Sequence, residues 1–225
     1  MHIPDGFIDV PTSAVFAGLA AAGVATALKG ARTQLDEKTA PLAGLTAVFI
    51  FAVQMLNFPV AAGTSGHLLG GALAAVLVGP WAATLALTVV LLMQGLLFAD
   101  GGLTAIGLNV FNMGVIGVWA GYGTFLLLRK FLPKNKSSIA LAAAIGGLLS
   151  VPAAAVGFTI QYAIGATATF STSTVLSAMV GTHVLIGIGE ALITGLTVSA
   201  VLASRSDLVY GWKNNTQKLE IRNAS

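Results

Sequence analysis

Few residues of this chain have side chains suited to chemistry, and two of its three histidines lie in short polar segments. His2 is the second residue of the chain, and His67 follows a loop at 57–66 that contains Pro59 and ends in Gly63, Thr64, Ser65 and Gly66. Histidine is the commonest metal-ligating side chain. The sequence contains no cysteine, which excludes thiolate metal sites, disulfides and thiol nucleophiles.

The position of His2 is more informative than its identity. A free α-amino group on Met1, the amide nitrogen of His2 and the Nδ1 atom of its ring can chelate one ion in two fused rings. His67 can fill the fourth place of a square plane. A metal bound in this way must displace the proton of the His2 amide. Ni²⁺ and Cu²⁺, which favour tetragonal nitrogen sites, are suited to this. We therefore expect a metal site at Met1, His2 and His67, with an affinity that falls as the pH drops.

Each histidine also has a simpler interpretation. His2 is equally compatible with a solvated terminal side chain, and His67 with a loop or helix-capping histidine packed against small residues. Sequence spacing does not show whether the two rings touch, so both interpretations stay open.

Asp5 and Asp9 are expected to fix the N-terminal head by hydrogen bonds rather than bind metal, because hard carboxylates fit poorly with an all-nitrogen site. Asp100 should lie in an outer turn with Gly101 and Gly102, and the alternative is that it attracts cations. A secretory signal peptide begins with basic residues, whereas this N-terminal segment carries the acidic residues Asp5 and Asp9. We therefore expect Met1 to remain on the mature chain.

His183 and Glu190 are seven residues apart and share one face of a predicted helix. Ionisable groups inside a membrane are costly and usually functional, but a structural pairing is an equal alternative, and we assign these two no ligand role. The candidate structural partners are Gln94, Asn109 and Asn112.

The composition is that of a membrane protein. Of 225 residues 56% are hydrophobic and only 8% are charged, where a soluble domain carries about a quarter charged residues. Short basic clusters beside apolar runs look like orientation signals and exclude nucleic-acid binding. We expect one all-α domain, residues 1–225, embedded in a lipid bilayer. Its transmembrane helices are predicted at about 10–28, 41–57, 67–78, 81–98, 104–128, 138–164 and 174–203.

The third predicted helix is too short to cross a membrane alone, and Gly79-Pro80 separates it from the fourth. Residues 67–98 therefore form either one long kinked crossing or a short helix, a tight turn and a full helix. Seven crossings with an outside N-terminus and a cytoplasmic C-terminus place every basic residue inside, as the positive-inside rule favours. These basic residues are Lys29, Arg32, Lys38, Arg129, Lys130, Lys134, Lys136, Arg205, Lys213, Lys218 and Arg222.

The first helix carries small residues four apart, which lets helices approach closely. We expect packing within the subunit, with docking to a separate membrane partner as the alternative. The two rows are Ala14, Gly18 and Ala22, and Ala17, Ala21 and Ala25.

Four segments resemble the CbiM/NikM family, the substrate-binding membrane (S) components of energy-coupling-factor (ECF) transporters for cobalt and nickel. They are MHIPDGFID at the start, QMLNFPVAAGTSGHLLGGALAAVLVGPWAA at 54–83, LLFADGGLTAIGLNVFNMG at 96–114 and IGIGEALITG at 186–195. The resemblance implies a seven-helix, multi-pass protein of the cell inner membrane whose N-terminus inserts into an outer pocket. It also implies that Met1, His2 and His67 hold the transported Ni²⁺ or Co²⁺.

The same resemblance implies partners: a transmembrane coupling (T) component, two ATP-binding cassette ATPases and often a small accessory membrane protein. No GxxxxGK[ST] motif is present, so we expect no ATP hydrolysis by this chain, no enzyme activity and no cofactor. We also expect no fused accessory segment. Nickel and cobalt are not distinguished.

The leading alternative is a self-sufficient secondary transporter or channel for divalent cations, in which Glu190 and His183 carry protons or line a path. Such proteins usually show repeated halves or several intramembrane acids, which this sequence lacks. An intramembrane metalloenzyme is a third class, and the HExxH motif that would favour it is missing.

Overall fold

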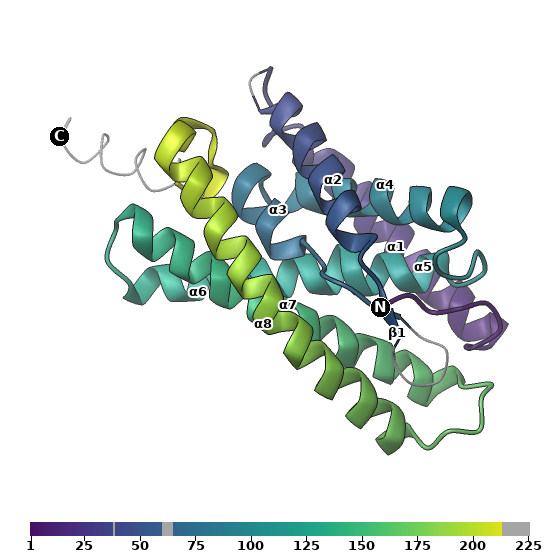
Figure 1. Ribbon diagram of the computed structural model, residues 1–225. Coiled ribbons are helices and arrows are strands. Elements are labelled where there is room, and N and C mark those ends of the chain that lie inside the picture. The colour runs from purple at the N-terminus through teal and green to yellow at the C-terminus, as the bar shows by residue number, and fades with distance from the viewer. Residues whose placement is uncertain (38, 60–64, 213–225) are drawn as a thin grey trace.

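The computed structural model describes residues 1–37, 39–59 and 65–212, and this part of the chain is almost entirely helical (Figure 1). Three consecutive elements form one long helix whose middle is wound as a π-helix: α5 (Ile106–Asn109), η2 (Val110–Gly117) and α6 (Val118–Phe131). The elements are α1 (Val10–Ala31), α2 (Ala40–Gln54), β1 (Phe58–Pro59), β2 (Ser65–Gly66), α3 (Gly71–Val78), α4 (Pro80–Phe98), α5 (Ile106–Asn109), η2 (Val110–Gly117), α6 (Val118–Phe131), α7 (Lys136–Gly165), α8 (Thr172–Arg205) and η3 (Ser206–Leu208).

The fold is that of an all-α polytopic membrane protein, as predicted. Five helices are long and apolar enough to cross a membrane: α1, α4, the α5–α6 unit, α7 and α8. The other two predicted crossings are shorter, because α2 has 15 residues and α3 has eight. The predicted ranges agree with the observed helices to within a few residues. The number of crossings and the side on which each terminus lies stay predictions, and Lys38 and the basic residues after 212 lie outside the described part.

The short helix α3 lies at the centre of the bundle, and all eight of its residues are buried. It ends at Gly79, whose φ of +92° is the left-handed conformation that glycine adopts without strain, and Pro80 starts α4 at once. Residues 67–98 are thus a short helix, a tight turn and a full helix, the second of the two alternatives. The helix starts at Gly71, four residues later than the predicted start at about 67, because residues 67–70 are not helical.

Two long helices, α7 and α8, run side by side and antiparallel (Figure 1). Near the start of α7, the Lys136 ammonium donates to the Leu202 carbonyl at the end of α8, at 2.8 Å. At the other end of α7, the Gly165 carbonyl accepts from the Asp9 amide, at 2.7 Å. The N-terminal head and the basic loop at 129–136 are therefore at opposite ends of a 30-residue helix, about 45 Å apart.

The small-residue rows of α1 do not pack inside the subunit. All six residues of these rows are exposed, and a Cβ atom built on Gly18 would meet nothing within 4 Å. Ala17 nevertheless lies against a neighbouring helix, because a Cβ atom built on Gly107 would overlap its backbone and side chain. Packing within the subunit was the wrong interpretation for this face, and docking to a membrane partner stays a prediction. The face of α1 that does pack inside carries Thr12, Ala20, Ala27 and Ala31.

The N-terminal head, residues 1–9, is part of the protein core. Met1 and Ile3 are fully buried, and Phe7 packs against the rings of Phe158 and Tyr162. A backbone bridge joins Ile8 to the end of α7. The head is thus folded into the bundle instead of lying on its surface.

Candidate metal centre

Hydrogen bonds to the main chain hold the head in place. The Asn109 side chain accepts from the Ile3 amide at 2.8 Å and donates to the Ile3 carbonyl at 3.4 Å. The same carbonyl accepts from the Gly102 amide at 2.8 Å. Because these hydrogen bonds hold both the amide and the carbonyl of Ile3, they fix the direction in which Met1 and His2 enter the protein.

The two aspartates of the head act as predicted. Asp5 accepts from the backbone amide and the hydroxyl of Thr104, and Asp9 caps α1 by accepting from the Thr12 amide at 2.9 Å. These hydrogen bonds lower the pKa of both carboxyl groups. Both side chains are therefore used to position the head.

The turn predicted at Asp100 to Gly102 packs closely against the head. Gly101 has a φ of +89°, and a Cβ atom there would lie only 2.9 Å from Nδ1 of His2. A Cβ atom on Gly102 would overlap the backbone of Asp5. Only glycine permits this approach of the two segments.

The structure brings the rings of His2 and His67 together. Their centroids are 4.7 Å apart and the planes are inclined by 30°. His67 is fully buried, and its Nδ1 lies 2.7 Å from the Leu68 carbonyl. Because a carbonyl only accepts, Nδ1 carries the proton and Nε2 presents a lone pair, for which the described residues provide no hydrogen-bond partner.

The ring of His2 faces a carboxylate. Its Nε2 lies 3.6 Å from Oδ2 of Asp100, and the same oxygen accepts from the Asn57 side chain at 2.7 Å. A proton on Nε2 would face this negative charge. That tautomer leaves Nδ1 bare, and Nδ1 is the atom that closes a chelate ring with the amide of His2.

Burial keeps the nitrogen atoms of this site neutral. It lowers the pKa of the Met1 amine from 8.0 to about 4, although Asp100 partly opposes the shift. Burial also lowers the pKa of His2 and His67 well below its ordinary value, and a charge on the amine lowers both further. At neutral pH the amine and both rings thus have lone pairs available, which is the form that a metal ion needs.

His2 also borders the surface of the protein. It lines an open depression of about 360 Å³ together with Asp5 and Asp100. The remaining lining residues are Pro4, Ala99, Gly101 and Gly102. A hydrated cation in this depression would meet two carboxylates before it reached the buried nitrogens.

His183 and Glu190 do not form the structural pairs considered from the sequence. Nδ1 of His183 donates to the Met179 carbonyl one turn earlier, and Glu190 accepts from backbone amides of the segment after His67. Asn112 instead pairs with Gln161. A charge on His183 adds to the lowering of the His67 pKa, an interaction that their sequence separation did not indicate.

Sequence reasoning missed Asn109 as an anchor of the head, and its importance can be tested. Asn109→Leu keeps the volume of the side chain but leaves the Ile3 amide unpaired, at a cost of about 1–3 kcal/mol. We expect Ni²⁺ affinity to drop about 5- to 150-fold in a calorimetric titration. Asn112→Leu, on the same helix but bonded to Gln161, is the control. An equal loss in both variants would contradict a specific role for Asn109.

Fold and site together define a class: a polytopic α-helical membrane protein whose own N-terminus is buried as part of a nitrogen-rich site. Residues 2–208 match the family model described as cobalt uptake substrate-specific transmembrane region. The chain belongs to this family, CbiM, and is thus a member of a family of cobalt and nickel transport proteins.

Curated relatives agree with this assignment. A putative metal transport protein of Haloquadratum walsbyi is 39% identical over 93% of this chain and 94% of its own length. A putative fused nickel transport protein NikMN of Archaeoglobus fulgidus is 40% identical over 93% of this chain and 68% of its own length. A cobalt transport protein CbiM of Sorangium cellulosum is 33% identical over 93% of this chain and 94% of its own length.

Two solved structures share the fold. A crystal structure of a truncated transition metal transporter matches with a TM-score of 0.82 and 35% identity, covering 90% of this chain and 99% of that chain. A second transition metal transporter matches with a TM-score of 0.83 and 34% identity, covering 90% and 93%. The helical arrangement described above is therefore that of transition metal transporters.

Proposed function

We propose that this chain is the substrate-binding subunit of an ATP-driven importer of the energy-coupling-factor type, which captures Ni²⁺ or Co²⁺ from outside the cell. The observation that carries the proposal is the meeting of three neutral, buried nitrogen donors: the Met1 amine, the His2 ring and the His67 ring. Within the described residues no three His, Asp or Glu side chains gather as a metal site. The proposed site therefore uses the main chain as well.

Each residue has a defined part in the proposed capture. The Met1 amine and the His2 amide close a five-membered ring on the ion, and the amide and Nδ1 of His2 close a six-membered ring. Nε2 of His67 takes the fourth place, for which its bare lone pair is suited. A late first-row ion in a nitrogen plane is the substrate that this donor set favours.

The proposed orientation places the head outside and the C-terminus in the cytoplasm. Its support is the separation of the head from the basic loop at 129–136 along the whole length of α7. Basic loops favour the cytoplasmic side. With seven crossings of the inner membrane, the open depression at His2 then faces the outer medium.

The proposed partners are a transmembrane coupling component, two ATP-binding cassette ATPases and a small accessory membrane protein. The sequence has no phosphate-cradling GxxxxGK[ST] loop, so the energy for import would come from separate subunits. Cells that express this chain with and without such ATPases would test this. Uptake of labelled nickel only with the ATPases supports the importer, whereas equal uptake by the chain alone would identify a self-sufficient transporter or channel.

The binding function itself is tested on the purified chain. We expect one Ni²⁺ ion per protein and a yellow square-planar absorption band. In His2→Ala and His67→Ala the band should be lost, and the metal content should fall at the nickel concentration that saturates the unmodified chain, leaving only weak residual binding. Metal analysis and visible spectroscopy after exposure to nickel and to cobalt provide the measurement, and the band intensities compare the two metals. Unchanged metal content in the two variants would rule out the proposed site.

A further inference from the structure

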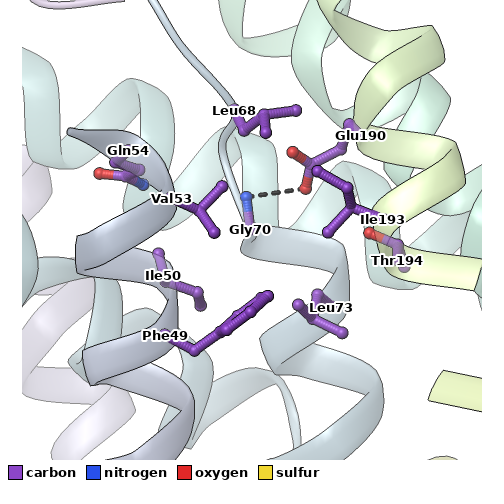
Figure 2. Close-up of a pocket in the computed structure, with 10 residues that line it drawn as sticks. All are labelled: Phe49, Ile50, Val53, Gln54, Leu68, Gly70, Leu73, Glu190, Ile193 and Thr194. Carbon is purple, nitrogen blue, oxygen red and sulfur yellow. Dashed lines mark hydrogen bonds between the residues drawn. The ribbon is translucent and has the colours of Figure 1, made fainter. Parts of the chain in front are cut away.

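The segment that joins His67 to α3 is very short, and buried side chains from two other helices hold it. Glu190 of α8 accepts from the Leu69 amide at 2.8 Å and from the Gly70 amide at 2.7 Å, one with each carboxylate oxygen. Figure 2 shows this carboxylate pointing at the start of α3 from the facing helix. Gln54 of α2 donates to the Leu69 carbonyl at 2.6 Å from the other side.

These bonds reach His67 through one peptide group. The peptide between Leu68 and Leu69 gives its N–H to Oε2 of Glu190, while its carbonyl accepts from Nδ1 of His67. The order is therefore carboxylate, peptide, imidazole. The next peptide, between Leu69 and Gly70, is held in the same way by Glu190 and Gln54.

A buried carboxylate is an expensive way to hold a chain segment. Glu190 is only 2% exposed, and ionisable groups inside a membrane protein usually have a function. A helix N-terminus attracts a carboxylate, but a neutral cap would also satisfy the amides of α3. A negative charge does more, because it polarises the peptide and makes the carbonyl a stronger acceptor for the His67 proton.

The small cavity beside this carboxylate does not explain it. It has a volume of about 10 Å³ and lies between α2, α3 and α8, with apolar neighbours such as Ile50 and Leu73 (Figure 2). Such a space is no larger than about one water molecule. It offers no room for a substrate, so the role of Glu190 must be sought in the segment that it binds.

We propose that Glu190, assisted by Gln54, is a positioning residue for His67, which fixes its ring and strengthens Nε2 as a metal donor through the intervening peptide. The arrangement corresponds to the carboxylate–histidine pairs that commonly orient metal ligands, with one peptide inserted between the two groups. This inference rests on the proposed function, because it requires His67 to bind the metal.

The test replaces the charge and keeps the shape. Glu190→Gln presents an amide NH₂ group to one of the two backbone amides, so one bond and the negative charge are lost. We expect Ni²⁺ affinity to fall about 10- to 100-fold, the usual range for groups that support a ligand. The square-planar band should weaken toward its absence in His67→Ala, since the fourth nitrogen is no longer held in place.

A double-mutant cycle separates positioning from a general loss of stability. If Glu190 acts through His67, then Glu190→Gln has no further effect on Ni²⁺ affinity in the His67→Ala background. The control is Thr194→Val, one turn further along α8, which is buried at the same cavity and has no hydrogen-bond partner for its hydroxyl among the described residues. This control should bind nickel like the unmodified chain.

Two results would overturn the proposal: wild-type affinity and spectrum in Glu190→Gln, or losses that add fully in the double mutant. If Glu190→Gln does not fold, then Gln54→Met provides the same cycle, with an expected loss of about 2- to 12-fold from one hydrogen bond. Normal nickel binding by His67→Ala would instead reject the metal site itself. The experiments thus distinguish a failure of the proposed role of Glu190 from a failure of the proposed metal site.

Discussion

Placing one residue before Met1, or acetylating its amine, is expected to abolish tight nickel binding while the helical bundle stays folded. Met1 is fully buried in the same apolar cluster as Ile3 and Leu69, so the structure has no room for a preceding residue. An acetylated nitrogen also loses the lone pair that begins the chelate. Because even supporting groups change metal affinity about 10- to 100-fold, the loss of a direct ligand should exceed about 100-fold.

Calorimetric titration of the purified chain with Ni²⁺ measures this loss, and circular dichroism checks that the helices remain. The matched control carries the same extra residue after Ser225. That variant should bind like the unmodified chain, because the added group is far in sequence from the head. Tight nickel binding by an N-terminally blocked chain would remove the amine from the site and with it the proposed chelate.

The helices were predictable from the sequence because the signals that define them are local. Apolar runs set the lengths of α7 and α8, and the observed ends lie close to the predicted ones. Gly79 and Pro80 separate α3 from α4, since one adopts a positive φ and the other cannot continue a preceding helix. None of these features needs a distant partner.

The helical faces were not predictable in the same way. Lipid is as apolar as the protein interior, so α1 is apolar all round and its sequence does not show which side is buried. The exposed row from Ala14 to Ala22 is an example. Small residues on such a helix fit a packing seam and a lipid-facing surface equally well.

The candidate site was predictable only where covalent neighbours define it. Met1 and His2 are adjacent, so their shared chelate follows from the sequence, but the contact between His2 and His67 depends on the whole fold. The segment after His67 departs from the predicted helix because its amides are bound by Glu190, more than 100 residues away. Asn109 is similarly distant from the head that it anchors.

Acidification is expected to weaken nickel binding in steps that the buried amine explains. The pKa of the Met1 amine is lowered from 8.0 to about 4 by burial. In a released head the amine takes up a proton below about pH 8, whereas the inserted amine stays neutral to about pH 4. The released state therefore gains stability as the pH falls through this window, by about 1.4 kcal/mol per unit, and gains nothing further below it.

Metal binding adds a second proton to this balance, because the amide of His2 must lose its hydrogen. If the head is already inserted before the metal binds, only the amide proton is released and the Ni²⁺ affinity should fall about tenfold per pH unit. If the head is not inserted beforehand, the amine proton is released as well and the affinity should fall about a hundredfold per pH unit. Titrations in two buffers of different ionisation enthalpy count the protons directly, about one or about two per ion. The melting temperature over the same range shows whether the bundle itself responds to acid. An affinity that stays flat between roughly pH 8 and 5 would contradict any site built on this amine and amide, since neither proton would then compete with the metal.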